Sequence, residues 1–74
     1  MNIYSAIAQG AKVLKDNFIN NPYLDSELLM AKVINKDRKY ILLNYQRPLN
    51  IKFLNKFHKL IKKTLLKYNG NYSN

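Results

Sequence analysis

Apolar residues recur along the chain every three or four positions, which is the spacing of an amphipathic helix. The first stretch places them at Ile3, Ile7, Ala11, Leu14 and Phe18. This pattern predicts a helix over residues 3–19. The sequence Asn20-Asn21-Pro22 then marks a boundary, because Asn caps helices well and Pro suits the first turn of the next helix.

The second and third helices follow from the same spacing. The second is predicted over residues 22–35, with its apolar side at Leu24, Leu28, Met30, Ala31 and Ile34. The third is predicted over residues 38–45 behind a cap at Asp37, with one face formed by Tyr40, Ile41 and Leu43. Both are short helices that need neighbours to bury their apolar faces.

The fourth helix is the longest predicted element. It follows a cap at Asn50 and ends at Gly70, so residues 71–74 are expected to form a frayed tail. Its apolar positions are Phe53, Leu54, Phe57, Leu60, Ile61, Thr64, Leu65 and Tyr68.

No segment alternates between apolar and polar residues as a strand does. The expected fold is therefore all-α, one small bundle of four to five short helices over residues 1–70. We expect Gly10, inside the first helix, to allow close packing against a neighbour. The core candidates are Leu28, Leu29, Phe53, Phe57, Leu60 and Ile61.

Basic charge is confined to the second half of the chain. The 74 residues hold 13 Lys and Arg against 4 Asp and Glu, which gives a net charge of +9. Residues 1–37 are neutral in sum, whereas residues 38–74 contain no acid. This asymmetry indicates an anionic partner such as nucleic acid, an acidic protein face or a lipid headgroup. A bias towards AT-rich codons is the alternative explanation, since Lys, Asn, Ile and Tyr make up 35 of the 74 residues.

The composition leaves little room for catalysis or for a metal site. The absence of Cys excludes disulfides, thiolate zinc sites and a cysteine nucleophile, and makes the cytoplasm the expected location. His58, the single histidine, has neither a metal ligand nor a nucleophile beside it on its helix. Asp25 and Glu27 point to different sides of their helix, and we interpret both as charges that complement its N-terminus. No catalytic, cofactor-binding or metal-binding residue is expected, and no apolar run is long enough to cross a membrane.

A stripe of lysines on the fourth helix is the best candidate for a binding surface. Lys52, Lys56, Lys59 and Lys63 follow one another at steps of four, three and four, opposite the apolar face. Such a stripe can lie along phosphates or an acidic surface, although a solvated helix face has the same pattern. The candidate docking residues are Arg38, Lys39, Arg47, Lys52, Lys56 and Lys59.

The middle of the chain carries a family resemblance. The run NPYLDSELLMAKVI at residues 21–34 resembles the P-x-x-D-A-E-L-L-L-A-x-V-L segment of the N-terminal domain of the release-factor glutamine methyltransferases, the PrmC/HemK family. NKDRKYILL at residues 35–43 is similar to the G-x-x-R-x-x-L-L stretch that follows it, and FHKLI at residues 57–61 matches the family's F-x-x-L-I. The likeness covers residues 3–63, and residues 22–43 are its most specific part.

This resemblance implies a helical bundle that precedes a Rossmann-like methyltransferase domain, which uses S-adenosylmethionine. In that family the enzyme methylates the Gln of the Gly-Gly-Gln motif in class I peptide-chain release factors, and the N-terminal domain helps hold the release factor. The family's catalytic N-P-P-Y and its glycine-rich cofactor loop belong to the second domain, and neither occurs in these 74 residues. We therefore expect a substrate-docking module with no cofactor and no catalysis of its own, whose partners are a release factor and a C-terminal methyltransferase domain.

Two other interpretations stay open. The chain can be a free-standing basic helical domain that binds nucleic acid through the lysine stripe together with Arg38, Lys39 and Arg47. It lacks the base-reading residues of a helix-turn-helix motif, which makes this the weaker alternative. The chain can also be a stable bundle that has no partner.

Overall fold

Four helices make up the described part of the chain. The computed structural model describes residues 1–72, and the side chains of residues 1–68. The helices are α1 (Ile3–Asp16), α2 (Pro22–Ile34), α3 (Arg38–Leu43) and α4 (Ile51–Tyr72). Within residues 1–72 there is no strand, only one isolated backbone bridge between Asn2 and Pro48. The predicted all-α bundle is therefore confirmed, with four helices.

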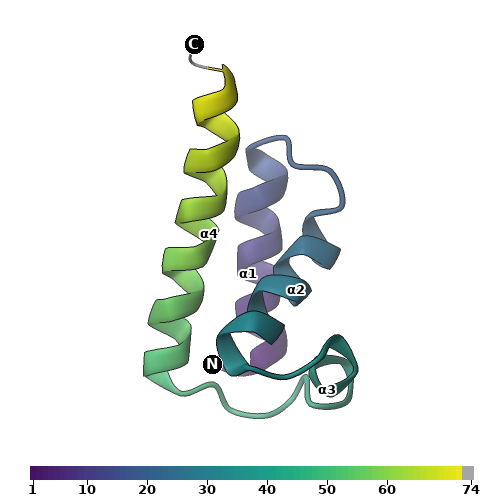
Figure 1. Cartoon of the computed structure of the whole chain (residues 1–74). Helices are drawn as coiled ribbons and strands as arrows, with labels where there is room; N and C mark the ends of the chain where they lie inside the picture. The colour runs from purple at the N-terminus through teal and green to yellow at the C-terminus, as the bar shows by residue number, and fades with distance from the viewer. Residues whose placement is uncertain (73–74) are drawn as a thin grey trace.

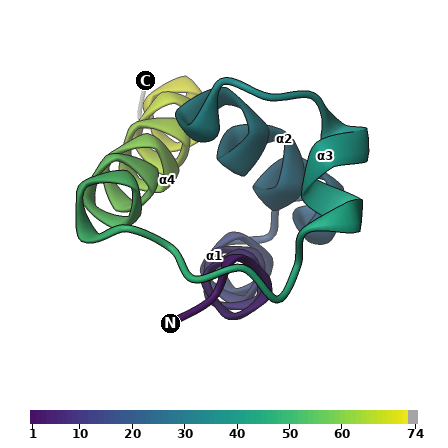
Figure 2. The same cartoon turned by 90° about the horizontal axis from the view of Figure 1, so that it is seen from below.

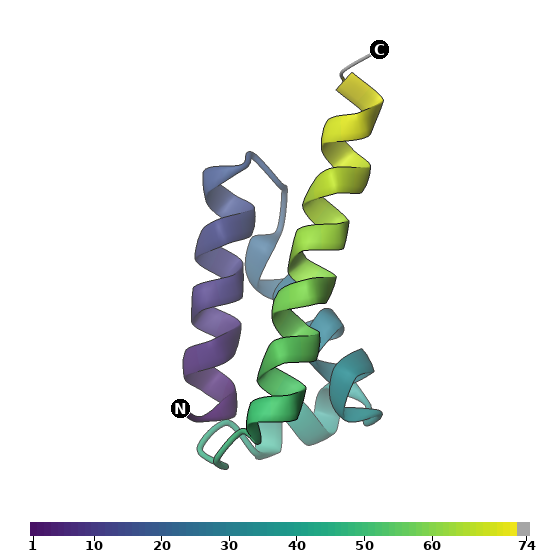
Figure 3. The same ribbon diagram turned by 90° about the vertical axis from the view of Figure 1, so that its left-hand side faces the viewer.

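The three long helices pack against one another, and α3 closes one end of the bundle (Figure 1). The helices α1 and α4 run in the same direction, and α2 runs in the opposite direction beside them. The connection after α3 passes the N-terminal end of α1 before it reaches α4 (Figure 2). With 22 residues, α4 projects beyond the ends of α1 and α2 (Figure 3). In residues 1–72, no helix combines the length and the apolar character that crossing a bilayer requires.

Side-chain caps fix the start of three helices. Asn2 Oδ1 accepts a hydrogen bond from the Ser5 N–H at 2.8 Å at the start of α1. The predicted caps of α3 and α4 are confirmed: Asp37 Oδ1 accepts from Tyr40 N–H at 2.9 Å, and Asn50 Oδ1 accepts from Lys52 N–H at 2.7 Å. These bonds satisfy amide groups that have no partner within the helix itself.

The start of α2 differs from the prediction. Asn21 precedes the helix, but its side chain makes no capping hydrogen bond. The backbone of Asn21 is left-handed, with φ at 53°, a conformation that Asn tolerates better than most residues. Asn21 therefore turns the chain, and Pro22 begins the helix with a φ that already suits it.

The first helix ends at Asp16, before the predicted end at residue 19. The amides of Phe18 and Ile19 bond back to the carbonyls of Lys15 and Leu14, each at 3.0 Å, which is the Schellman pattern of a helix end. Phe18 is left-handed at this point, with φ at 63°, and its side chain is 94% exposed. The prediction that Phe18 belongs to the apolar face is therefore wrong.

The fourth helix also differs from the prediction at its C-terminal end. The helix continues through Gly70 to Tyr72, so Gly70 does not end it. Of the predicted tail, residues 73 and 74 lie outside the described residues.

Three leucines assigned to apolar faces are largely exposed. Leu24 is 39%, Leu28 48% and Leu43 73% exposed. The buried face of α2 consists instead of Ser26, Glu27, Met30 and Ala31, so two of its four buried positions are polar. On α3 only Ile41 is fully buried, because this helix has six residues and covers only the end of the bundle. Leu28 is therefore not a core residue.

The core is a single cluster to which every helix contributes. Its largest members are Ile7 and Leu14 on α1, Met30 on α2, Ile41 on α3 and Phe57 on α4, all fully buried. The predicted core positions Phe57 and Ile61 are confirmed, while Leu29, Phe53, Leu54 and Leu60 are half-buried.

Gly10 confirms its predicted packing role. A Cβ added at this position would lie 2.7 Å from Phe57 Cζ and 2.7 Å from Ser26 Oγ. The Ser26 hydroxyl is itself held, because it donates a hydrogen bond to the Ile7 carbonyl at 2.8 Å. The missing side chain thus lets α1, α2 and α4 meet at one level of the bundle.

Candidate functional site

A groove lined by four lysines runs between α2 and α4. Its volume is about 380 Å³, and Val33 and Leu60 contribute apolar contacts to it. The charged side chains that line it are Lys32, Lys56, Lys59 and Lys63. Of the described side chains that line this lysine groove, none is acidic. It can therefore attract carboxylates or phosphates over a surface with an apolar floor.

The lysine groove includes part of the predicted stripe and adds one residue to it. Lys56, Lys59 and Lys63 come from α4 as the helical spacing predicts. Lys32 comes from α2, in the electrically neutral half of the chain, and is not among the predicted docking residues. Only the packing of α2 against α4 brings it to the stripe, and helical spacing within one segment contains no signal for such a pairing.

The other predicted docking residues lie elsewhere. Lys52 is exposed in the first turn of α4, and Lys39 is exposed on α3. Arg47 lies in the connection between α3 and α4, where its carbonyl accepts the Ile3 N–H at 3.0 Å. None of these residues lines the lysine groove, and neither does Arg38. Of the six predicted docking residues, the structure brings Lys56 and Lys59 to the lysine groove and places the other four outside it.

Arg38 is committed to an internal ion pair. Its Nε and Nη2 donate hydrogen bonds to Glu27 Oε1 at 3.2 and 3.0 Å. The Glu27 side chain is 7% exposed and that of Arg38 is 48% exposed. Two donors on one buried carboxylate oxygen tie the start of α3 to α2. Glu27, interpreted from the sequence as a charge that complements the N-terminus of α2, lies beyond the first turn and is a buried partner of Arg38.

Tyrosines complete this cluster. The Tyr45 hydroxyl donates a hydrogen bond to Glu27 Oε2, and this bond raises the pKa of Tyr45 to about 12. The Tyr4 ring packs edge-on against Tyr45 with 5.3 Å between ring centroids. The neighbouring Tyr4 raises the pKa of Tyr23 above its ordinary value. Both Glu27 oxygens thus accept hydrogen bonds from other parts of the bundle, which suits a structural role.

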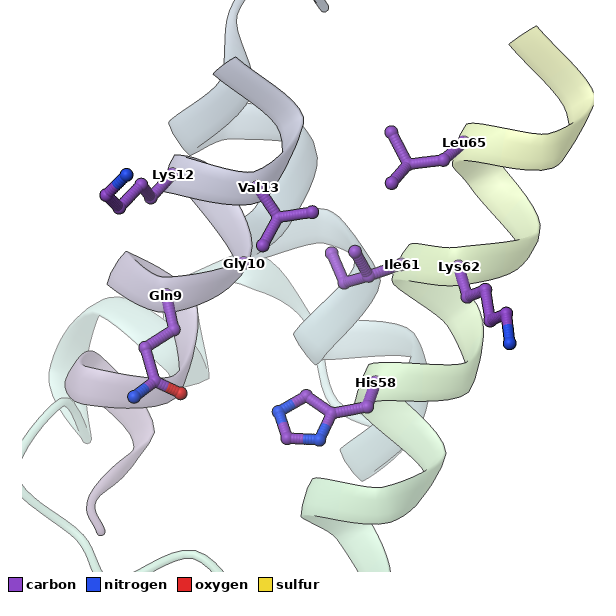
Figure 4. A pocket seen from close by; sticks show the side chains of 8 residues that line it. All are labelled: Gln9, Gly10, Lys12, Val13, His58, Ile61, Lys62 and Leu65. Carbon is purple, nitrogen blue, oxygen red and sulfur yellow. The ribbon is translucent and has the colours of Figure 1, made fainter. Parts of the chain in front are cut away.

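A second groove lies between α1 and α4, and its surface is mainly apolar. It has a volume of about 530 Å³ and is lined by Gln9, Gly10, Lys12, Val13, His58, Ile61, Lys62 and Leu65 (Figure 4). His58, the single histidine, stands at this groove rather than in a cluster of ligands. Among the residues that the structure describes, no three His, Asp or Glu side chains lie close enough together to hold a metal ion.

One comparison with known proteins identifies the family. The family model described as the PrmC N-terminal domain matches residues 5–68, which is most of the chain. No curated protein and no solved structure matches it. The match covers most of α1, all of α2 and α3 and most of α4, so it includes both grooves and the residues Glu27, Arg38 and Tyr45. The chain therefore belongs to the family of PrmC N-terminal domains.

Proposed function

We propose that this chain is the substrate-recognition domain of a release-factor glutamine methyltransferase. In this role it holds a class I peptide-chain release factor while a separate catalytic domain methylates the Gln of the Gly-Gly-Gln motif. The domain itself performs no chemistry, and it acts in the cytoplasm as part of translation termination.

The family match over residues 5–68 is the observation that carries this proposal. The surface supports it, because the lysine groove offers four cations around an apolar floor. Charges arranged in this way accelerate the encounter with an acidic partner more than they tighten the final complex. The lysine groove is therefore the first contact that we assign to the release factor.

The residues of this chain do not fit S-adenosylmethionine. A cofactor of this kind is held by a glycine-rich loop at the end of a strand, but the chain has only 2 Gly and residues 1–72 form no strand. At one of the two, Gly10, the space beside the backbone is occupied by the side chains of Phe57 and Ser26. In the proposed enzyme the cofactor binds to the catalytic domain.

A binding titration tests this function. The 74-residue chain is titrated with a class I release factor and, in parallel, with a random DNA duplex, each at two salt concentrations. We expect binding to the release factor that weakens with salt, and weaker binding to the duplex. Binding to the duplex alone would instead support the nucleic-acid interpretation, and binding to neither would contradict the proposal.

Two triple variants with equal loss of charge test the role of the lysine groove. The first replaces Lys56, Lys59 and Lys63 by Gln, and the second replaces Lys15, Lys36 and Lys67 by Gln. Because all six side chains are exposed, both variants should fold like the parent chain. Only the first should slow association with the release factor by about tenfold. Equal effects of the two variants would show that net charge, and not the groove, drives binding.

A further inference from the structure

The apolar groove between α1 and α4 is a second surface, and the contacts assigned above to the lysine groove do not involve it. Side chains from both helices point into it, Val13 from α1 and Ile61 and Leu65 from α4 (Figure 4). Val13 is 40% exposed there, and Leu65 is half-buried. The groove is also the larger of the two, at about 530 Å³ against 380 Å³. An apolar hollow of this size is a typical place for a partner's apolar side chains.

The position of the groove, between two helices, suits a helical ligand. It lies between α1 and α4, which run in the same direction, and α4 continues past the end of α1 at Asp16 (Figure 3). The groove is lined by residues 9–13 of α1 and by residues 58–65 of α4. Peptides also bind by adding a strand to a sheet edge, but residues 1–72 contain no sheet. An apolar hollow between two helices instead matches the mode in which an amphipathic helix lays its apolar face into a groove.

The rim of the groove is basic on both sides. Lys12 on α1 and Lys62 on α4 flank the groove with their ammonium groups directed outward (Figure 4), and the described side chains that line the groove include no acid. Lys12 pairs with Asp16 at 3.0 Å, but the two side chains are 76% and 59% exposed. An exposed pair of this kind is weak, so Lys12 can exchange Asp16 for a carboxylate of a partner. The complementary ligand is apolar along its centre and acidic at its edges.

We infer that the groove between α1 and α4 binds an amphipathic, acidic helix of the release factor. Apolar side chains of that helix pack against Val13, Ile61 and Leu65, and its carboxylates meet Lys12 and Lys62. The inference rests on the proposed function and adds the kind of segment that is recognised and the place where it binds. The two grooves flank α4, one against α1 and the other against α2, so α4 is the centre of the interface.

Methyl resonances of the intact domain locate the bound partner. The chain is labelled at the methyl groups of Ile, Leu and Val and titrated with a class I release factor. We expect the signals of Val13, Ile61 and Leu65 to shift or broaden, while those of Leu42 on α3 stay unchanged. Changes confined to other methyl groups would overturn the inference and leave the proposed function intact. No change anywhere, together with no binding in the titration, would overturn both.

Matched variants then test the contacts. Val13→Ser removes an apolar group from the groove, and Leu66→Ser makes a similar apolar-to-polar change at a position on α4 that is 62% exposed and outside the groove. We expect Val13→Ser to raise the Kd for the release factor by about tenfold and Leu66→Ser to leave it unchanged. Lys62→Glu should likewise weaken binding more than Lys67→Glu, which changes the net charge equally. Equal effects within each pair would contradict a helix seated in this groove, provided that the thermal unfolding curves show folded variants.

Discussion

Glu27 on α2 accepts two hydrogen bonds from Arg38 at the start of α3, although the two residues are 11 positions apart in the sequence. The same carboxylate accepts a hydrogen bond from Tyr45, beyond the end of α3. One buried acid therefore holds both ends of a six-residue helix that is too short to be stable alone.

Removing this acid should destabilise the bundle. Glu27→Ala leaves the Tyr45 hydroxyl and the Arg38 guanidinium without their acceptor, and we expect a loss of about 2 kcal/mol in the free energy of unfolding. Half of the Arg38 side chain is exposed, so water compensates part of the loss. Urea denaturation measures the change. Asp16→Asn, which breaks an exposed ion pair, is the control and should change stability by less than about 0.5 kcal/mol.

Alkaline pH should loosen the same cluster. The hydrogen bond to Glu27 raises the pKa of Tyr45 to about 12, so between pH 10 and 12 the folded chain keeps a proton that the unfolded chain releases. The stability that this bond contributes is complete below pH 10 and is lost as the pH rises to about 12. Unfolding measured across this range should show a steeper decline for the parent chain than for Tyr45→Phe. Parallel declines would contradict the role of Tyr45.

Gly10→Ala should destabilise the domain, although the same change stabilises most helices. The added Cβ would lie 2.7 Å from both Phe57 Cζ and Ser26 Oγ. Phe57 is fully buried and Ser26 is hydrogen-bonded, so neither can move aside easily. Overpacking of about 1–3 kcal/mol exceeds the gain in helix propensity of about 1 kcal/mol. In a Phe57→Leu background the penalty of Gly10→Ala should shrink, and an unchanged penalty would show that the ring is not its cause.

Phe18→Gly should stabilise the chain. Phe18 occupies the left-handed position of the Schellman motif, where a side chain costs about 1–2 kcal/mol and where glycine is the usual residue. Glycine loses about 0.5–1 kcal/mol more backbone entropy on folding, so the net gain should be near 0.5–1 kcal/mol. Thermal unfolding measures this gain. Phe18→Ala, which keeps a Cβ at the same φ, should bring no comparable increase.

The sequence predicts the helices well because their signals are local. The caps at Asp37 and Asn50 lie next to the amides that they bind, and the spacing of Ile3, Ile7 and Leu14 determines the buried face of α1 without reference to other helices. The ends of α1 and α4 are predicted less well. At Phe18 a bulky residue adopts a backbone conformation that its side chain disfavours, and at Gly70 a typical helix terminator lies inside a helix.

The features that depend on packing between helices are not predictable in this way. Glu27 looks like a surface acid until α3 brings Arg38 to it. Leu28 looks like a core residue because the true buried face of α2 includes Ser26, whose polarity hides the pattern. The candidate site shows the same limit, since Lys32 and Val13 join α4 only through tertiary contacts that no single segment encodes.

The clustering of lysines around the groove between α2 and α4 has a consequence for ionic strength. With no acid in residues 38–74, the ammonium groups of α4 repel one another in the free domain. Added salt screens this repulsion and should raise the melting temperature, while it weakens attraction to an acidic partner. The stability of the domain and its affinity for an acidic partner thus respond to salt in opposite directions. If the complex dissociates as the salt concentration rises, the domain that is released is more stable than it was at low salt.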